Sequence, residues 1–222
     1  MAEYHPGLKT FIILLRDGQV TLREGLERLM AIGNPESEVP WIVRIMENPV
    51  FDVPPLSMFR GRVTLAQHDC IHLLLGRGTT LMDEAFTIGF TMGSTKRMST
   101  SALELFGKVA GRLYPKAYRF PPAAVQVFHD AVHLASISGC EPLDRVDFHA
   151  LMDLPLHEIR CRLGVEENLL QAYYEVEAAR NPGIPACRRL VTPSEEVAPH
   201  EAGRPGARHR SGCDPFGGGN PG

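Results

Sequence analysis

The sequence predicts an all-α protein, a multi-helix bundle that contains a metal-binding helical hairpin and ends in a disordered C-terminal tail. Three observations lead to this fold class. Apolar side chains recur at helical spacing through most of residues 1–180. Capping-box patterns, prolines and glycines mark helix starts and ends between these stretches. No pair of alternating segments joined by a hairpin turn is present, and neither GxGxxG nor GxxxxGK[ST] occurs.

Four segments precede the region that carries the chemistry. Residues 8–18 hold an apolar run that ends at a glycine, which predicts a short helix. Residues 21–33 begin with a Thr-x-x-Glu capping box and carry a stripe of leucines, which predicts a second helix. A proline at the first helical position favours a helix over 40–48, whereas the three prolines within 48–62 predict a loop.

A helical hairpin is predicted next. Its first helix begins at Thr64 with a Thr-x-x-Gln capping box and ends near Gly76, which suits a C-cap. Its second helix begins near Thr80 and runs to about Lys96. Helices 101–114, 123–139, 155–164 and 166–180 follow, each from apolar residues at helical spacing and from prolines or glycines at its ends.

The composition changes after residue 180. Residues 181–222 contain seven prolines and eight glycines and almost no apolar periodicity. Such a segment cannot bury enough apolar surface to offset the entropy that ordering would cost. We therefore expect an all-helical metal-binding domain at 1–180 and a disordered tail at 181–222.

Four polar residues stand out within the hairpin. His68 and His72 are four residues apart, so their imidazoles project from one face of a helix, and Asp69 lies beside them. His72 lies about four residues before the turn at Gly76, and Glu84 lies about four residues after the start of the second helix at Thr80. At about 1.5 Å per residue, each is therefore roughly 6 Å from the loop. In an antiparallel hairpin, Glu84 therefore lies level with His72 and the four residues can surround one cation.

The ligand types narrow the choice of metal. No two of the five cysteines form a CxxC pair, so a cysteine-based zinc site is not expected. Two histidines and two carboxylates suit zinc, iron, manganese or magnesium. If Asp69 holds a histidine N–H instead of the metal, three protein ligands remain and a coordination position is open. The alternative is that His68 and His72 are ordinary helix histidines paired with local carboxylates.

The pattern HDxxH-x11-E, formed by His68, Asp69, His72 and Glu84, resembles the metal motif of the fourth Coq protein family of ubiquinone (coenzyme Q) biosynthesis. The resemblance covers residues 64–86, about a tenth of the chain. It implies an all-helical fold, a divalent metal that is usually zinc, and a polyprenylated benzoquinone precursor with proposed oxidative decarboxylation at ring carbon 1. It also implies a peripheral position at the membrane and association with other ubiquinone-biosynthesis proteins.

Two further patterns leave alternatives open. A second HDxxH at His129, Asp130 and His133 lacks a glutamate at the matching distance. It is a candidate second metal site of a dinuclear centre, a core helix with satisfied histidines, or a group that faces the substrate. Small residues at four-residue spacing, Gly89 and Gly93 among them, allow either a neighbouring helix or an isoprenoid chain to approach closely.

Composition and motif together define the function that we expect. The formal net charge of −3 gives no basic excess for nucleic acid. We expect a metal-dependent decarboxylase or lyase-like enzyme that acts on a polyprenylated quinone precursor or isoprenoid lipid, in a homo-oligomer. The alternatives are a non-catalytic lipid-binding or assembly module with a structural metal, and an HD-type phosphohydrolase. The N-terminal apolar run is too short for a signal peptide, so we expect a cytoplasmic protein, peripheral at the inner membrane face.

Overall fold

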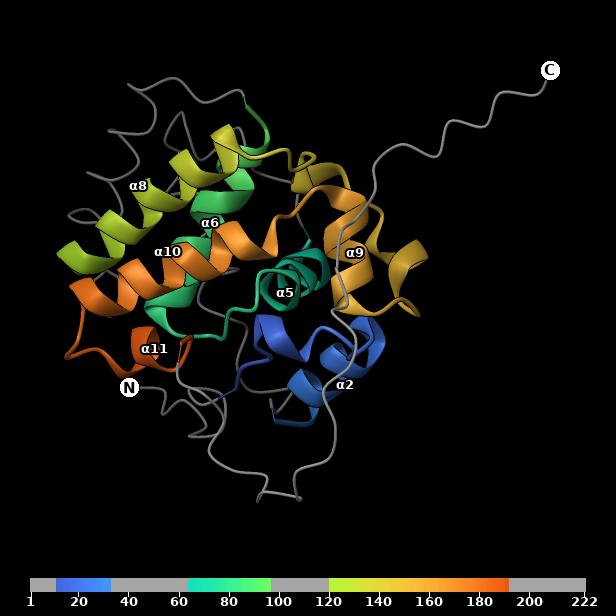
Figure 1. Cartoon of the computed structure of the whole chain (residues 1–222). Helices are drawn as coiled ribbons and strands as arrows, with labels where there is room; N and C mark the ends of the chain where they lie inside the picture. The colour runs from blue at the N-terminus through green and yellow to red at the C-terminus, as the bar shows by residue number, and fades with distance from the viewer. Residues whose placement is uncertain (1–10, 33–63, 97–119, 192–222) are drawn as a thin grey trace, which may run out of the picture. The chain divides into compact units, whose positions relative to one another are not determined.

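The computed structural model describes residues 11–32, 64–96 and 120–191. In these ranges the protein is helical and has no strand, which confirms the predicted all-α fold class (Figure 1). The α-helices are α2 (Leu22–Ile32), α5 (Leu65–Leu74), α6 (Leu81–Ser94), α8 (Pro122–Ile137), α9 (Leu156–Leu163), α10 (Glu167–Arg180) and α11 (Pro185–Arg188). Short 3-10 helices are η1 (Leu15–Asp17), η3 (Leu143–Arg145) and η4 (Phe148–Leu151). The helices expected at 40–48 and 101–114, the loop at 48–62 and the tail from residue 192 lie outside the described residues.

The predicted hairpin consists of α5 and α6, and both of its capping boxes form. The Thr64 hydroxyl accepts from the backbone N–H of Gln67, and Thr80 and Asp83 make the corresponding pair at the start of α6. The turn between the helices requires Gly76, whose φ of +66° lies in the left-handed region. A Cβ at this glycine would also lie 3.0 Å from Leu15 Cδ2, so the turn packs closely on the N-terminal segment.

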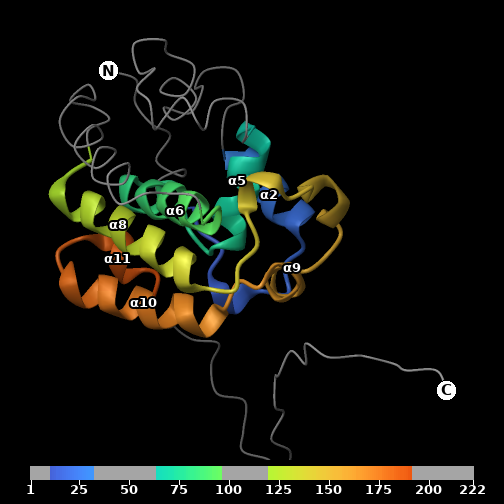
Figure 2. The same cartoon turned by 90° about the horizontal axis from the view of Figure 1, so that it is seen from above.

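Helix α6 packs along α8, and the two helices lie side by side in both views (Figure 2). The small residues of α6 face this contact. A Cβ at Gly89 would lie 2.5 Å from the carbonyl oxygen of Phe128, and a Cβ at Gly93 would meet the carbonyl oxygen of Val132. The backbone of α8 therefore fills the space beside Gly89 and Gly93. This favours helix packing over an isoprenoid-binding slot as the role of these small residues.

A buried ion-pair network joins the hairpin to α10. The guanidinium of Arg77, in the hairpin turn, donates to both carboxylate oxygens of Glu177 at 3.0 and 2.5 Å. It lies between two aromatic rings, 3.8 Å from the centroid of Phe86 and 4.1 Å from that of Tyr174. Burial lowers the pKa of Arg77, but the charge of Glu177 outweighs burial and raises the pKa above its usual range. Arg77 is therefore a fixed charge that holds the turn against α10.

Two other arginines hold the ends of the hairpin helices. Arg160 of α9 is fully buried and donates to the carbonyl oxygen of Leu74 at 2.7 Å and to that of Leu73 at 3.4 Å. These carbonyls belong to the last turn of α5, where a cation also complements the helix dipole. Arg189, which follows α11, donates to the carboxylate of Asp83 in the first turn of α6. Both ends of the turn are thus fixed by residues from the C-terminal third of the chain.

Two sequence expectations need correction. Within residues 11–18 only Leu15–Asp17 are helical, as a 3-10 turn, so the helix predicted at 8–18 is wrong for residues 11–14. The side chains of Phe11, Ile13 and Leu15 are buried while the two residues between them are less so, and this period of two belongs to extended chain.

Residues 181–191, which the sequence assigns to the disordered tail, are part of the described helical structure. Pro185 begins α11, where a proline is compatible with a helix, and both Cys187 and Leu190 are buried. The proline and glycine content of the whole C-terminal segment obscured these two buried apolar residues. None of the helices in the described ranges is both long and apolar enough to cross a membrane.

Candidate metal centre

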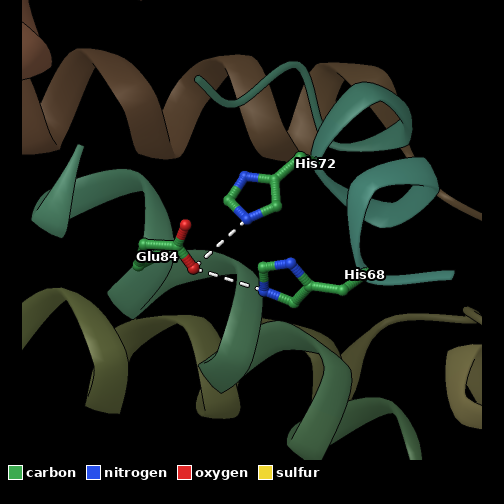
Figure 3. A group of neighbouring side chains, drawn as sticks. All are labelled: His68, His72 and Glu84. Atoms are coloured by element: carbon green, nitrogen blue, oxygen red, sulfur yellow. Dashed lines mark ion pairs between the residues drawn. The ribbon is translucent and has the colours of Figure 1, made fainter. Parts of the chain in front are cut away.

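The hairpin brings His68, His72 and Glu84 together (Figure 3). Oε2 of Glu84 lies 3.2 Å from Nε2 of His68 and 3.3 Å from Nε2 of His72. The ligand atoms of the three side chains all lie within 4.8 Å of one another. The two histidines project from the same face of α5 and Glu84 projects toward them from α6, as the i, i+4 spacing and the matched distances from the turn predict.

The three facing atoms are buried and lack hydrogen-bond partners. The side chains of His68, His72 and Glu84 are 12%, 4% and 7% exposed. The two nitrogens and the carboxylate oxygen are in ion-pair contact, but none of the three atoms has a hydrogen-bond partner. Unsatisfied buried polar atoms are costly and rare. Three such atoms that face one another are the arrangement expected of ligands to a shared cation.

The charges of His68, His72 and Glu84, the triad, are coupled. Burial lowers the pKa of His68, but the carboxylates of Glu84 and Asp69 outweigh burial and raise it to about 9. Burial raises the pKa of Glu84, but the adjacent imidazoles of His72 and His68 outweigh it and hold the pKa below its usual range. The carboxylate is therefore ionised at neutral pH and available as an anionic ligand. A metal ion must displace a proton from His68.

Asp69 lies outside the convergent group. Its Oδ1 is 3.9 Å from Nδ1 of His68, on the side of the ring away from Nε2, and its side chain is 32% exposed. The structure thus places it where its charge acts on His68, and not among the atoms that face Glu84. Of the two roles that the sequence left open for Asp69, this position favours support of a ligand over ligation.

The second HDxxH does not form a comparable group within the described part of the chain. Asp130 accepts from Gln126 at 2.9 Å, from the hydroxyl of Tyr173 at 3.2 Å and from Arg180 at 2.8 Å. His133 is exposed, and His129 is half-buried with its ring against Phe128. The structure favours a helix that contacts α10 through Asp130 over a second metal site.

Sequence reasoning missed Thr87, which contacts His72 at the ring nitrogen that does not face Glu84. Its hydroxyl oxygen lies 3.3 Å from Nδ1 of His72, and the side chain is fully buried. Thr87 follows Glu84 by three residues, so both face α5 from the same side of α6. That i, i+3 relation to the glutamate is the signal that could have identified it.

The donor set determines what the site can do. Two neutral imidazole nitrogens and one carboxylate could hold a divalent metal ion, and they are the ligand types of open zinc sites with a position for water or substrate. Comparisons of the chain with models of protein families, with curated proteins and with solved structures found no match. A functional assignment therefore rests on the geometry of His68, His72 and Glu84 and on the resemblance of the HDxxH-x11-E motif.

Proposed function

We propose that this protein binds one zinc ion per chain through Nε2 of His68, Nε2 of His72 and a carboxylate oxygen of Glu84, and uses it on a prenylated aromatic substrate. The observation that carries the proposal is the set of three buried, mutually facing ligand atoms without hydrogen-bond partners. Buried polar atoms without a hydrogen-bond partner are costly, and a bound cation would satisfy all three.

Three protein ligands favour a reactive site over a purely structural one. Structural zinc sites in proteins are usually closed by four protein ligands, often thiolates, whereas catalytic sites keep a position open. The buried thiol nearest in sequence to the triad is Cys70, and burial raises its pKa to about 12, which makes it a poor ligand. Asp69 does not complete the group as a fourth ligand. The open position would take water or an oxygen of the substrate.

The proposed substrate class comes from the motif. The HDxxH-x11-E pattern resembles that of a family that handles polyprenylated benzoquinone precursors, and here its two histidines and its glutamate converge as a metal site requires. A bound zinc ion would supply Lewis-acid polarisation of an oxygen on the aromatic ring. Association with a membrane, in which prenylated compounds dissolve, is part of the same proposal.

The roles of the protein side chains follow from their positions. His68 and His72 provide nitrogen ligands from the rigid α5, and Glu84 provides the anionic ligand from the first turns of α6. Asp69 orients His68 and, because its side chain is partly exposed, can also accept a proton from solvent or substrate. The buried network around Arg77 holds the turn that keeps the two helices in register.

Metal content of the purified protein tests the proposal. Native mass spectrometry and elemental analysis should find one divalent ion per wild-type chain and none in His72→Ala or Glu84→Gln. The matched control is His133→Ala, which removes an exposed histidine of the second HDxxH and should keep the ion. Equal metal content in the wild type and in His72→Ala would contradict the proposal.

Cobalt substitution separates a reactive site from a structural one. The visible spectrum of the Co²⁺ protein should change when azide or a prenylated hydroxybenzoate is added, because the open position exchanges its ligand. A response to azide alone would support the open site and contradict the substrate class. A spectrum that no added ligand changes would favour the assembly module with a structural metal.

A further inference from the structure

His72 is in contact at both ring nitrogens, and one helix supplies both contacts. Nε2 faces Oε2 of Glu84 at 3.3 Å, and Nδ1 lies 3.3 Å from the hydroxyl oxygen of Thr87. Glu84 and Thr87 are one turn apart on α6. The imidazole is almost fully buried, so water cannot readily replace either contact.

The two contacts differ in kind. Nε2 of His72 is unsatisfied and faces the other ligands, whereas Nδ1 has the hydroxyl of Thr87 as its partner. A neutral imidazole has one N–H and one lone pair, and the hydrogen bond made by one nitrogen decides which tautomer is present. When the Thr87 hydroxyl accepts from the Nδ1–H, the lone pair is on Nε2, where the metal would bind.

We propose that Thr87 is a positioning residue that fixes His72 in the tautomer able to bind metal through Nε2. The inference rests on the metal site proposed above and adds a residue that belongs to no part of the HDxxH-x11-E pattern. Metal-binding histidines generally donate their second N–H to an oxygen, and loss of that partner typically weakens metal binding about 10–100-fold. The two histidines are supported differently, His68 by the charge of Asp69 and His72 by a neutral hydroxyl.

A general packing role does not account for the contact. Thr91 lies one turn further along α6, is also buried, and donates its hydroxyl to the backbone carbonyl of Thr87 at 2.7 Å. This is the ordinary use of a threonine hydroxyl within a helix. Thr87 instead has its hydroxyl directed at a ring nitrogen of a ligand on another helix. Thr91 is therefore a matched control for removal of a buried hydroxyl from α6.

The test compares zinc affinity in the full-length protein by competition with a chromophoric chelator. Thr87→Val keeps the shape of the side chain but removes the hydroxyl, and its Kd for zinc should rise about 10–100-fold. Thr87→Ser keeps the hydroxyl and should bind like the wild type, and Thr91→Val should also bind like the wild type. If Thr87→Val does not fold, as judged by circular dichroism, Thr87→Ala and Thr87→Ser make the same comparison.

A spectroscopic measurement separates positioning from a loss of stability. In zinc-loaded protein with ¹⁵N-labelled histidine, the wild type should show His72 protonated at Nδ1 and metal-shifted at Nε2. Thr87→Val should show faster exchange of the Nδ1 proton.

Three results would decide against the inference. Wild-type affinity in Thr87→Val, or a wild-type His72 bound through Nδ1, would overturn the role of Thr87 and leave the metal site intact. A wild type that binds no zinc would overturn both this inference and the proposed function.

Discussion

Substitution of Glu177 by glutamine should destabilise the metal-free protein by about 3 kcal/mol, the lower end of the cost of breaking a buried ion pair. The wild-type carboxylate accepts two hydrogen bonds from Arg77, and both side chains are buried. A glutamine amide accepts at its oxygen but presents an N–H group to the guanidinium at its other end. Arg77 would keep one hydrogen bond, to the amide oxygen, together with the distant Asp83 at 3.9 Å and its contacts with the two aromatic rings.

The magnitude follows from what remains around the cation. Loss of one charge-assisted hydrogen bond accounts for about 1.5–3 kcal/mol, and an uncompensated buried charge adds to this. The aromatic sandwich retains about 1–2 kcal/mol of stabilisation, which is why the expected cost lies at the lower end. The double substitution Arg77→Met with Glu177→Leu should cost less than the sum of the two single substitutions, because no charge is left buried without a partner.

Urea unfolding followed by far-UV circular dichroism, with a chelator present, measures these differences. The matched control is Glu158→Gln, which removes an exposed i, i+4 ion pair with Arg162 and should cost less than about 0.5 kcal/mol. A cost below about 1 kcal/mol for Glu177→Gln would refute the reasoning, because a buried pair that can be broken so cheaply is not what holds the turn. Additive single and double substitutions would refute the coupling.

Two further predictions concern pH and packing. Because the folded pKa of His68 is raised to about 9, its contribution to the stability of the metal-free protein is complete below about pH 6.5 and is lost as pH rises through about 9. The lowered pKa of Glu84 makes its contribution complete above about pH 4.5 and lost on acidification. Because zinc must displace the proton of His68, zinc affinity measured by chelator competition should rise about tenfold per pH unit near neutrality; a flat profile would mean that no proton is displaced. Gly89→Ala should lower the melting temperature despite the better helix propensity of alanine, because the new Cβ would lie 2.5 Å from the carbonyl oxygen of Phe128. In the control Gly25→Ala, the new Cβ meets only the movable side-chain ends of Leu73 and Ile13, and a larger loss there than at Gly89 would contradict this explanation.

The sequence predicted those parts of the fold that depend on neighbouring residues. The capping boxes at Thr64 and Thr80 formed, and the spacing of His68, His72 and Glu84 around a glycine turn brought three ligand atoms together. The capping boxes span one helical turn, and each ligand lies within about two turns of the glycine turn, so the local pattern contains the information.

One feature that was missed depends on residues far apart in the chain, and the others lie in segments whose local pattern is ambiguous. Arg77 and Glu177 are separated by 100 positions, and nothing in the turn sequence indicates that its arginine is buried between aromatic rings. The apolar run before Leu15 predicts a helix, but the chain there is extended, because a short apolar run fits either period. The ordered residues after Asn181 were masked by the composition of the segment that follows them.

The position of Arg160 and Arg77 has a consequence for any attempt to move the ligand motif elsewhere. The three ligands lie within one segment of the chain, so residues 64–96 could be copied as a unit into another helical scaffold. The carbonyls at the end of α5 and the guanidinium in the turn, however, are satisfied by α9 and α10. A transplanted hairpin would carry the three metal ligands, but its buried arginine and the carbonyls at the end of α5 would have no partners. A designer would therefore have to graft those distant partners as well.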